Sequence, residues 1–521
     1  MDESNKKILL VSMPFSEIAI PSIQLCLLKS YLKKRNVNID VGHFYLNAAN
    51  IYGIKNYNFL VNSKAGAYAS QMGFSKYVFP KYFNENIQKF KNFYNENVLT
   101  EENCIFDFDS YLQKTDEFYN NVINQKNLEK YDLIGFSLNY SQFLPSLAIA
   151  KKIKENYPDK KIVFGGSRTV GKIGKNVLKT FDYIDYIVSG DGEESLYKLS
   201  INEKPEDVQN LIYRKEKEIS YNKSNSNLDL NNLPIVDFDS FYEELKDSLP
   251  EIKQYYHVYG RLPLEISRGC WWNKCTFCNL NIQHKKYREK NTEKIINEIK
   301  FLSDKYKILK FQIIGNTLPL NNYRKLFEEI IKIGKDFSFI AETRSGRLKK
   351  DDYQLLKKAG FTTIQTGIES FSSSYLKKMN KGARLIDNIA ALKYSRENNI
   401  KNSYNLIVDY PNEDEKDYFE TLKNIKLFKQ YLDPPQISTF LLGYKSPIFN
   451  NPDNFNIKHK NTNFETTIVP DNKSFVMGDN RDNSFDSRDP EFGFIDINQI
   501  QGKPIYIYWA KDKSRIGKKL K

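Results

Sequence analysis

Long apolar runs are missing from this sequence. A membrane-spanning helix needs about 18 consecutive apolar residues, and the run from Ile8 to Phe15 is only long enough for a strand. The sequence therefore predicts no transmembrane helix, and no signal peptide is readable. We expect no membrane partner.

Cysteine is also scarce, with five among 521 residues. So few cysteines cannot form a disulfide framework for a chain of this length. Three of them, Cys270, Cys275 and Cys278, fall within nine positions, which favours metal ligation in a reducing compartment. We therefore expect a cytoplasmic protein.

A block of basic residues is absent as well, although the formal net charge is +14. Because the lysines are spread along nearly every amphipathic segment, the charge does not predict a nucleic-acid partner and would suit an acidic peptide equally well. Hydrophobic residues make up 40% of the chain and aromatic residues 14%, more than a disordered chain carries. A chain of this length is too long for one core, so we expect several domains.

Residues 1–220 alternate between strand and helix patterns. Apolar strand signals span residues 7–12, 37–41, 133–137, 161–164 and 185–188, with helical patterns at 22–34 and 145–156 between them. Such alternation predicts a doubly wound, Rossmann-like α/β domain. The Tyr- and Phe-rich residues 50–130 predict a helical insertion in it.

A second run of alternation covers residues 256–450, after an acidic, Asn-rich linker predicted at 221–255. The repeated strand–helix unit predicts a full or partial (β/α) barrel of the TIM type, with its active site where the strands end. From 451 to 521 the composition changes to Asn- and Asp-rich loops with one strand, Lys503 to Trp509, which predicts a small β-rich module.

The three clustered cysteines follow the strand predicted at Leu264 to Ser267, where the second alternating region begins. Three thiolates can ligate three irons of a four-iron cluster and leave the fourth iron open to a substrate. The spacing of Cys275 and Cys278 also fits zinc, with His284 as a possible fourth ligand. Spacing alone leaves both interpretations open.

The string from Glu265 to Leu280 resembles the cysteine motif of the radical S-adenosylmethionine (SAM) superfamily. In that superfamily an aromatic residue, here Phe277, precedes the last cysteine and contacts the adenine. The resemblance narrows to maturation enzymes of ribosomally synthesised peptides (RiPPs), many of which are cobalamin-dependent C-methyltransferases. It is carried, in order, by residues 9–15, 131–137, 165–166, 365–370, 379–382, 405–411 and 433–435.

The cysteine loop departs from the family pattern. The four residues between Cys270 and Cys275 make a spacing shorter than in this family and longer than in most of the superfamily. Because loops tolerate changes of length at little cost, a [4Fe–4S] cluster on Cys270, Cys275 and Cys278 is still implied.

The resemblance also implies SAM contacts at the ends of barrel strands, where polar residues gather. An adenosyl donor needs its amino and carboxylate groups chelated and its ribose hydroxyls hydrogen-bonded. Each of these residues could equally be an ordinary polar residue at a strand end, and their shared face is what favours a site. The candidates are Phe277, Gly315, Asn316, Glu342, Arg344, Gly367 and Glu369.

The first domain resembles the cobalamin-binding domain of the same family. Glycines after a strand let the backbone approach a large planar ligand. The Asp-x-His-x-x-Gly motif that supplies a lower cobalt ligand is absent, since Asp40 and His43 have the wrong spacing; the family usually lacks it too, and the domain could instead serve packing or peptide docking. The candidate cobalamin contacts are Ser137, Ser146, Gly165, Gly166, Gly190 and Glu193.

Residues 469–509 resemble the C-terminal conserved box of bacterial signal peptidase I. In that family the position of Ser484 supports a catalytic lysine, and those of Asp486 and Arg488 form an ion pair. The nucleophile and lysine boxes that a serine–lysine peptidase also needs are absent, because Ser12 to Phe15 only mimics the first of them. We do not expect peptidase activity.

The sequence thus predicts a radical SAM enzyme that modifies a ribosomal precursor peptide, by cobalamin-dependent C-methylation of an unactivated carbon. Its partners would be that peptide and an external electron donor of the ferredoxin or flavodoxin type. Two alternatives stay open: a cobalamin-independent radical modification of the peptide, and a non-catalytic binding module stabilised by zinc. The individual catalytic residues are not predicted.

Overall fold

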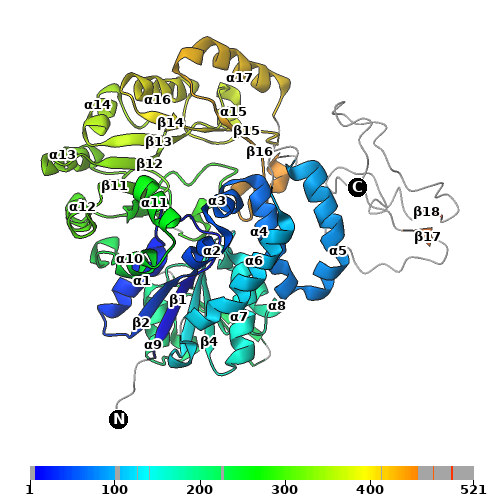
Figure 1. Cartoon of the computed structure of the whole chain (residues 1–521). Coiled ribbons are helices and arrows are strands. Elements are labelled where there is room, and N and C mark those ends of the chain that lie inside the picture. The colour runs from blue at the N-terminus through cyan, green and yellow to red at the C-terminus, as the bar shows by residue number, and fades with distance from the viewer. Residues whose placement is uncertain are drawn as a thin grey trace.

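The computed structural model describes residues 6–455, apart from 100–105, 126, 140, 217, 225–227, 285 and 412, together with the short strands β17 (Lys473–Ser474) and β18 (Ile495–Asp496). Two α/β units lie against each other, one coloured mainly blue to cyan and the other mainly green to orange (Figure 1). The strand predicted at residues 503–509 lies outside the described residues, as does most of the predicted C-terminal module.

A seven-stranded sheet forms the first unit, with the strand order β2-β1-β3-β4-β5-β6-β7. Its first five strands are parallel and are mostly buried, as expected for a sheet covered on both faces. Strand β6 pairs antiparallel with β5 and forms a hairpin with the edge strand β7, which the sequence pattern did not predict. The strands are β1 (Ile8–Ser12), β2 (Ile39–His43), β3 (Leu133–Leu138), β4 (Lys161–Gly166), β5 (Tyr186–Val188), β6 (Leu211–Lys215) and β7 (Glu218–Tyr221).

The strand order contains a switch point. The chain passes from β1 to β2 at one edge, and after the helical insertion it returns to place β3 on the other side of β1. Ligands of open α/β sheets bind outside the carboxyl ends of the strands at such a point. The predicted doubly wound fold is confirmed, and the ends of β1 and β3 mark its ligand-binding edge.

Among the described residues between β2 and β3, five α-helices form the predicted insertion. Their buried rings, including those of Tyr52, Phe74 and Phe118, belong to one apolar cluster with Leu9 and Val11 of β1. The helices are α2 (Phe44–Tyr52), α3 (Ile54–Asn62), α4 (Lys64–Val78), α5 (Pro80–Phe93) and α6 (Phe108–Asn121). The remaining helices of this unit are α1 (Ile23–Lys33), α7 (Phe143–Asn156), α8 (Lys172–Thr180) and α9 (Glu193–Ser200).

The second unit is built on a parallel sheet with the order β14-β13-β12-β11-β8. A bridge between Glu369 and Leu406 and the parallel pair β15–β16 continue the arrangement. The described strands therefore form an open, partial barrel. They are β8 (Leu262–Glu265), β11 (Lys310–Ile314), β12 (Ser338–Arg344), β13 (Phe361–Gly367), β14 (Lys401–Ser403), β15 (Asn405–Val408) and β16 (Gln436–Thr439).

Helices cover the outer side of this partial barrel (Figure 1). The apolar face of α13 shows why: Leu326, Phe327 and Ile330 are buried in a core cluster shared with Phe311 and Phe339 of the sheet. The helices are α12 (Thr292–Tyr306), α13 (Tyr323–Ile333), α14 (Lys350–Lys358), α15 (Ser373–Lys378), α16 (Leu385–Glu397), α17 (Glu415–Phe428) and α18 (Pro447–Asn450).

The segment predicted as a linker, residues 221–255, carries two helices, α10 (Asp239–Lys246) and α11 (Pro250–Tyr259). Phe238 and Phe241 are fully buried, the first in the core cluster of the barrel sheet and the second in that of the insertion. The segment therefore packs against both units, although its apolar residues are too unevenly spaced to show a clear period.

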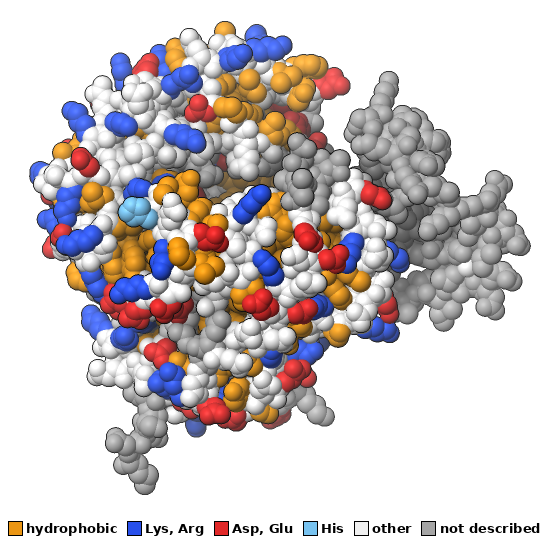
Figure 2. Space-filling model, in the orientation of Figure 1, with side chains coloured by type: hydrophobic (Ala, Val, Ile, Leu, Met, Phe, Trp, Pro, Cys, Tyr) orange, Lys and Arg blue, Asp and Glu red, His pale blue; other side chains and the backbone are white. Residues whose placement is uncertain are grey.

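The surface carries charges of both signs. Lys and Arg side chains are scattered among Asp and Glu over the visible face, and they do not gather into one basic block (Figure 2). Across the part of the chain that the structure describes, helices long and apolar enough to cross a membrane are absent.

Candidate cofactor site

The three cysteines lie on the loop that follows the short strand β9 (Ser267–Arg268). Asn281 fixes the beginning of this loop: the Cys270 amide donates to its Oδ1 at 2.7 Å, and its Nδ2 donates to the Cys270 carbonyl at 2.9 Å. The Cys278 amide donates to the Cys275 carbonyl at 3.2 Å. Three thiols are thus presented by one hydrogen-bonded loop.

The thiols lie within electrostatic range of one another. Burial raises the pKa of Cys278, and its neighbours Cys275 and Cys270 raise it further. Nη1 of Arg344 approaches Sγ of Cys275 at 3.7 Å. A guanidinium group thus lies beside one of the three candidate cluster ligands.

A second loop, residues 379–382, braces the cysteine loop. The Thr276 amide donates to the Met379 carbonyl, and Nε1 of Trp272 donates to the Asn380 carbonyl, both at 3.0 Å. Gly382 has a φ of +69°, and a Cβ there would lie 2.0 Å from the Trp272 ring. The resemblance in sequence at residues 379–382 therefore has a local reason in packing against the cysteines.

Lys381 joins two predicted contacts, Phe277 and Glu369, and sequence reasoning missed it. Its Nζ lies 2.6 Å from Oε1 of Glu369 and 5.8 Å from the centroid of the Phe277 ring. Gly367 leaves room for it, because a Cβ at that position would lie 2.7 Å from Nζ. Lys381 could have been proposed from sequence, because it lies within residues 379–382, which share the family resemblance. Arg344 also belongs to this group, since its Nη2 donates to the Lys381 carbonyl.

Glu342 lies on β12 two residues before Arg344, on the face opposite the buried Ala341 and Thr343. Its side chain is solvent-exposed, but protein atoms around it reduce its hydration. This loss of hydration raises the pKa of its carboxyl. Its parallel neighbour on β13 is Gln365. The open face of the partial barrel therefore presents a carboxyl and an amide side by side.

A cavity of about 790 Å³ lies between the two units. Its lining includes five of the six predicted cobalamin contacts and two of the predicted SAM contacts: Ser137, Gly165, Gly166, Gly190, Glu193, Gly315 and Asn316. The volume is within the usual range for cofactor pockets. The structure brings the strand ends of both sheets to one cavity.

The position of Ser146 does not agree with its predicted role as a cobalamin contact. It is fully buried within α7, where its Oγ donates to the Gln142 carbonyl at 2.6 Å. It is not among the residues that line the cavity. The error arose because a residue inside a helix was matched to a motif without knowing which face of the helix meets the core.

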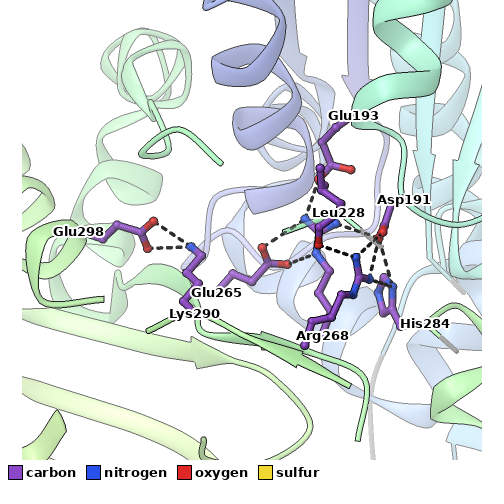
Figure 3. Close-up of polar contacts among 9 residues, drawn as sticks. Asp191, Glu193, Leu228, Glu265, Arg268, His284, Lys290 and Glu298 are labelled. Atoms are coloured by element: carbon purple, nitrogen blue, oxygen red, sulfur yellow. Dashed lines mark hydrogen bonds and ion pairs between the residues drawn. The ribbon is translucent and has the colours of Figure 1, made fainter. Parts of the chain in front are cut away.

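A group of charged residues around Arg268, the Arg268 network, joins the two units at the wall of the cavity (Figure 3). Arg268 donates to Asp191 at 2.9 Å and to Glu193 at 2.6 Å, both from the first unit, and to Glu265 of its own unit at 2.8 Å. Arg288 donates to Asp191 at 2.6 Å. Burial alone would raise the pKa of Asp191, but hydrogen bonds from His284 and Arg288 and the charge of Arg268 hold it well below its usual range.

His284, the residue proposed to complete a zinc site, lies in this network instead. Its Nδ1 is 3.3 Å from Oδ1 of Asp191. Among the described residues, no three His, Cys, Asp or Glu side chains are grouped closely enough to hold one metal ion. The ligands of a four-iron cluster bind different irons and need not converge on one point.

Residues 264–425 match the family model of the radical SAM superfamily, and residues 410–509 match that of signal peptidase, peptidase S26. The chain is 24% identical over 318 residues to the anaerobic magnesium-protoporphyrin IX monomethyl ester cyclase of Synechocystis sp., an alignment of 58% of this chain and 60% of that protein. The chain thus spans less than two thirds of the length of this relative.

Two solved structures share the fold of both units. The cobalamin-dependent SAM radical enzyme OxsB superposes with a TM-score of 0.57 at 16% identity, covering 87% of this chain and 56% of that one. The radical SAM methyltransferase TsrM from Kitasatospora setae gives 0.57 at 13%, covering 85% and 77%.

The fold and the cysteine loop define an α/β protein with three free cysteines at the mouth of a partial barrel. Its residues 264–425 resemble the radical SAM superfamily. This resemblance implies a [4Fe–4S] cluster and SAM as cofactors. The residues fit both groups, because the three cysteines are free, thiolates are the ligands that such clusters take, Glu342 is exposed on β12, and Asn316 lines the cavity.

Proposed function

We propose that this protein is a radical SAM enzyme that methylates an unactivated carbon of a ribosomally synthesised peptide, using cobalamin. The observation that carries the proposal is the cavity between the units, which joins the ligand-binding edge of a doubly wound sheet to the cysteine loop. Similar folds in OxsB, with cobalamin in its name, and in the methyltransferase TsrM support it.

The residues fit a corrinoid as well as they fit the cluster. Gly165 has open space where a side chain would project, since the nearest heavy atom to a Cβ there is the Val188 carbonyl oxygen at 3.9 Å. Apolar residues Ile23, Leu27 and Leu28 of α1 line another part of the cavity. A large planar ligand with polar edges suits a site that combines an apolar wall with strand ends.

When bound, the cluster and SAM would supply a 5′-deoxyadenosyl radical, and cobalamin a methyl group. The chain's own residues position these groups. Cys270, Cys275 and Cys278 would ligate the cluster, and Phe277 with Lys381 would border the adenosyl donor. The Arg268 network keeps the two units in register, so that the two cofactor sites face one another.

The peptide would enter from the open face of the partial barrel, and a ferredoxin or flavodoxin would deliver the electron. The cytoplasm is the proposed location, because thiolates and clusters persist in a reducing compartment. A cobalamin-independent modification of the peptide is the second candidate, and the absence of corrinoid in active protein would favour it.

The metal content tests the proposal. Protein reconstituted anaerobically with iron and sulfide should hold about four irons per chain, and Cys275→Ala should lose most of them. The matched control is Cys26→Ala, which changes a free cysteine buried in α1. Wild-type protein without iron, or an unchanged iron content in Cys275→Ala, would overturn the radical assignment.

The corrinoid content and the reaction product test whether the protein uses cobalamin and methylates a peptide. Incubation with hydroxocobalamin and gel filtration should leave a corrinoid absorption with the protein. If a short precursor peptide is encoded beside this gene, it is the substrate to assay: methylated product supports C-methylation, whereas an altered but unmethylated peptide supports the second candidate.

Peptidase activity is not proposed. The serine that resembles a nucleophile, Ser12, ends β1 and is buried, and its Oγ accepts a hydrogen bond from Nε2 of Gln142 at 2.9 Å. Ser484, Asp486 and Arg488 lie outside the described residues.

A further inference from the structure

The last strand of the partial barrel has a free edge. Among the described residues, β16 pairs only with β15, in parallel. The amides of Gln436 and Phe440 donate to carbonyls on the β15 side at 3.0 and 2.8 Å. Because a parallel ladder uses every second residue of a strand, the backbone groups of Ile437 and Thr439 point away from β15. Neither of these two amides has a partner elsewhere in the part of the chain that the structure describes.

The sequence of β16 does not block this edge. Natural edge strands usually avoid further pairing through charged side chains, proline or a bulge. The strand Gln436–Thr439 has none of these features. Its Ile437 is 65% exposed, and Leu441 just beyond the strand is 83% exposed. An edge of this kind can accept another extended chain as an added strand.

The chain that follows β16 leads directly into the candidate cofactor site. Leu442, Gly443 and Tyr444 line the cavity between the units. Nδ2 of Asn279, the residue after Cys278, donates to the Tyr444 carbonyl at 3.3 Å. An extended chain paired with β16 would therefore lie beside a strand whose continuation contacts the cysteine loop.

One face of an added strand would look towards the cysteine loop. Side chains alternate between the two faces of a sheet. Ile407 lies in register beside Ser438, and it belongs with Phe277 and Met379 to one apolar cluster. Residues of an added strand on this face would project towards the barrel mouth, and the residues between them would cover Ile437.

We propose that the free edge of β16 binds the substrate peptide by strand addition. The inference rests on the proposed function, since it takes the substrate to be a peptide. The occupant is an extended segment, held by its backbone, with an apolar side chain beside Ile437. The net charge of +14 favours acidic residues in that peptide. Strand addition holds the main chain and leaves alternate side chains free to enter the site.

Hydrogen exchange of the β16 amides tests the proposal. Because main-chain hydrogen bonds give the affinity in strand addition, the probe needs no particular sequence. The probe is a capped octapeptide of alternating valine and glutamate, added at millimolar concentration to reconstituted full-length protein without SAM. Exchange in residues 436–441, followed by mass spectrometry, should slow about tenfold. The same peptide methylated on every backbone nitrogen should have no effect.

Proline variants locate the binding. Ile437→Pro and Thr439→Pro each remove one outward amide without removing a bond to β15, because proline lacks the N–H and is tolerated at sheet edges. Each should raise the dissociation constant of a fluorescein-labelled probe about tenfold and leave the iron content unchanged. Ile437→Val keeps the amide and an apolar side chain, so this matched control should bind as the wild type does.

Several results would overturn the proposal. Slow exchange before any peptide is added would mean that the edge is already covered, by other residues of this chain or by a second copy. A probe that gives no protection would exclude the edge as a peptide site. Equal protection by the methylated peptide, or wild-type affinity in both proline variants, would place the contact elsewhere. Each of these results leaves the radical assignment standing, because binding is measured without SAM, whereas failure of that assignment would appear in the iron content.

Discussion

At the scale of single residues, Gly382 shows how one position controls the cysteine loop. The space that a side chain would need there is filled by the Trp272 ring, which lies 2.0 Å from where a Cβ would be, and φ is +69°. Gly382→Ala should therefore suffer both backbone strain and a clash. We expect a loss of roughly 2–4 kcal/mol in unfolding free energy and a lower iron content after reconstitution.

Gly334→Ala is the matched control for Gly382. Gly334 has a φ of +70°, but nothing lies within 4 Å of its Cβ position. It should cost only the strain of the left-handed conformation, about 1 kcal/mol, and leave the iron content unchanged. Urea unfolding and iron analysis measure both effects; equal losses in the two variants would contradict the packing role of Gly382.

The lowered pKa of Asp191 predicts that the stability of the fold depends on pH. Its folded pKa lies below the unfolded value of about 3.9, so its contribution to stability is present above about pH 4 and is lost as the pH falls further. Asp191→Asn should lower the unfolding free energy at pH 7 by about 3–5 kcal/mol, because buried arginines lose their partner. It should also flatten the decline in stability between about pH 4 and pH 3.

Urea unfolding over this pH range measures the effect. Asp247→Asn, at an exposed position after α10, is the control and should keep the wild-type profile. A decline of wild-type steepness in Asp191→Asn would show that other carboxyls govern acid stability.

At the scale of elements, strand β4 and its glycine end shape the corrinoid space. Because a Cβ at Gly165 meets only the Val188 carbonyl oxygen at 3.9 Å, Gly165→Leu should fold and project its side chain into the cavity. We expect it to lose corrinoid binding while retaining wild-type iron content. Absorption spectroscopy and iron analysis of the same sample measure both.

The control for Gly165 adds the same side chain elsewhere. Lys172→Leu places leucine at an exposed position of α8 and should bind corrinoid normally. Undiminished corrinoid binding by Gly165→Leu would place the ligand outside the cavity.

Elements with a continuous apolar pattern were predictable from sequence, and those without one were not. The buried strands at Ile8, Leu133 and Ile162 were found because both faces of a parallel strand are apolar. The hairpin β6–β7 was missed, since its outer residues such as Arg214 and Glu218 break the apolar run.

The residues of the candidate site also divide into those that were predictable from sequence and those that were not. The cysteines are close in sequence and carry a recognisable spacing, so they could be proposed directly. The partnership of Lys381 with Glu369, and of Asp191 with His284, depends on how separate segments meet in the fold. No local pattern encodes such contacts, and a structure was needed to find them.

At the scale of the whole molecule, the Arg268 network connects the two units, and both units line the cavity. The barrel provides the cysteine loop, and the doubly wound sheet provides the glycine-ended strands. This arrangement gives the proposed reaction two cofactor sites that face each other. In the proposed reaction the cysteine loop supports reductive cleavage of SAM.

Formation of 5′-deoxyadenosine would report this cleavage. Anaerobically reconstituted protein is mixed with SAM and dithionite, and the nucleoside is measured by mass spectrometry. We predict 5′-deoxyadenosine from the wild-type protein and none above background from Cys275→Ala. Wild-type protein that holds its full complement of iron and yet forms no 5′-deoxyadenosine would contradict this role of the cysteine loop.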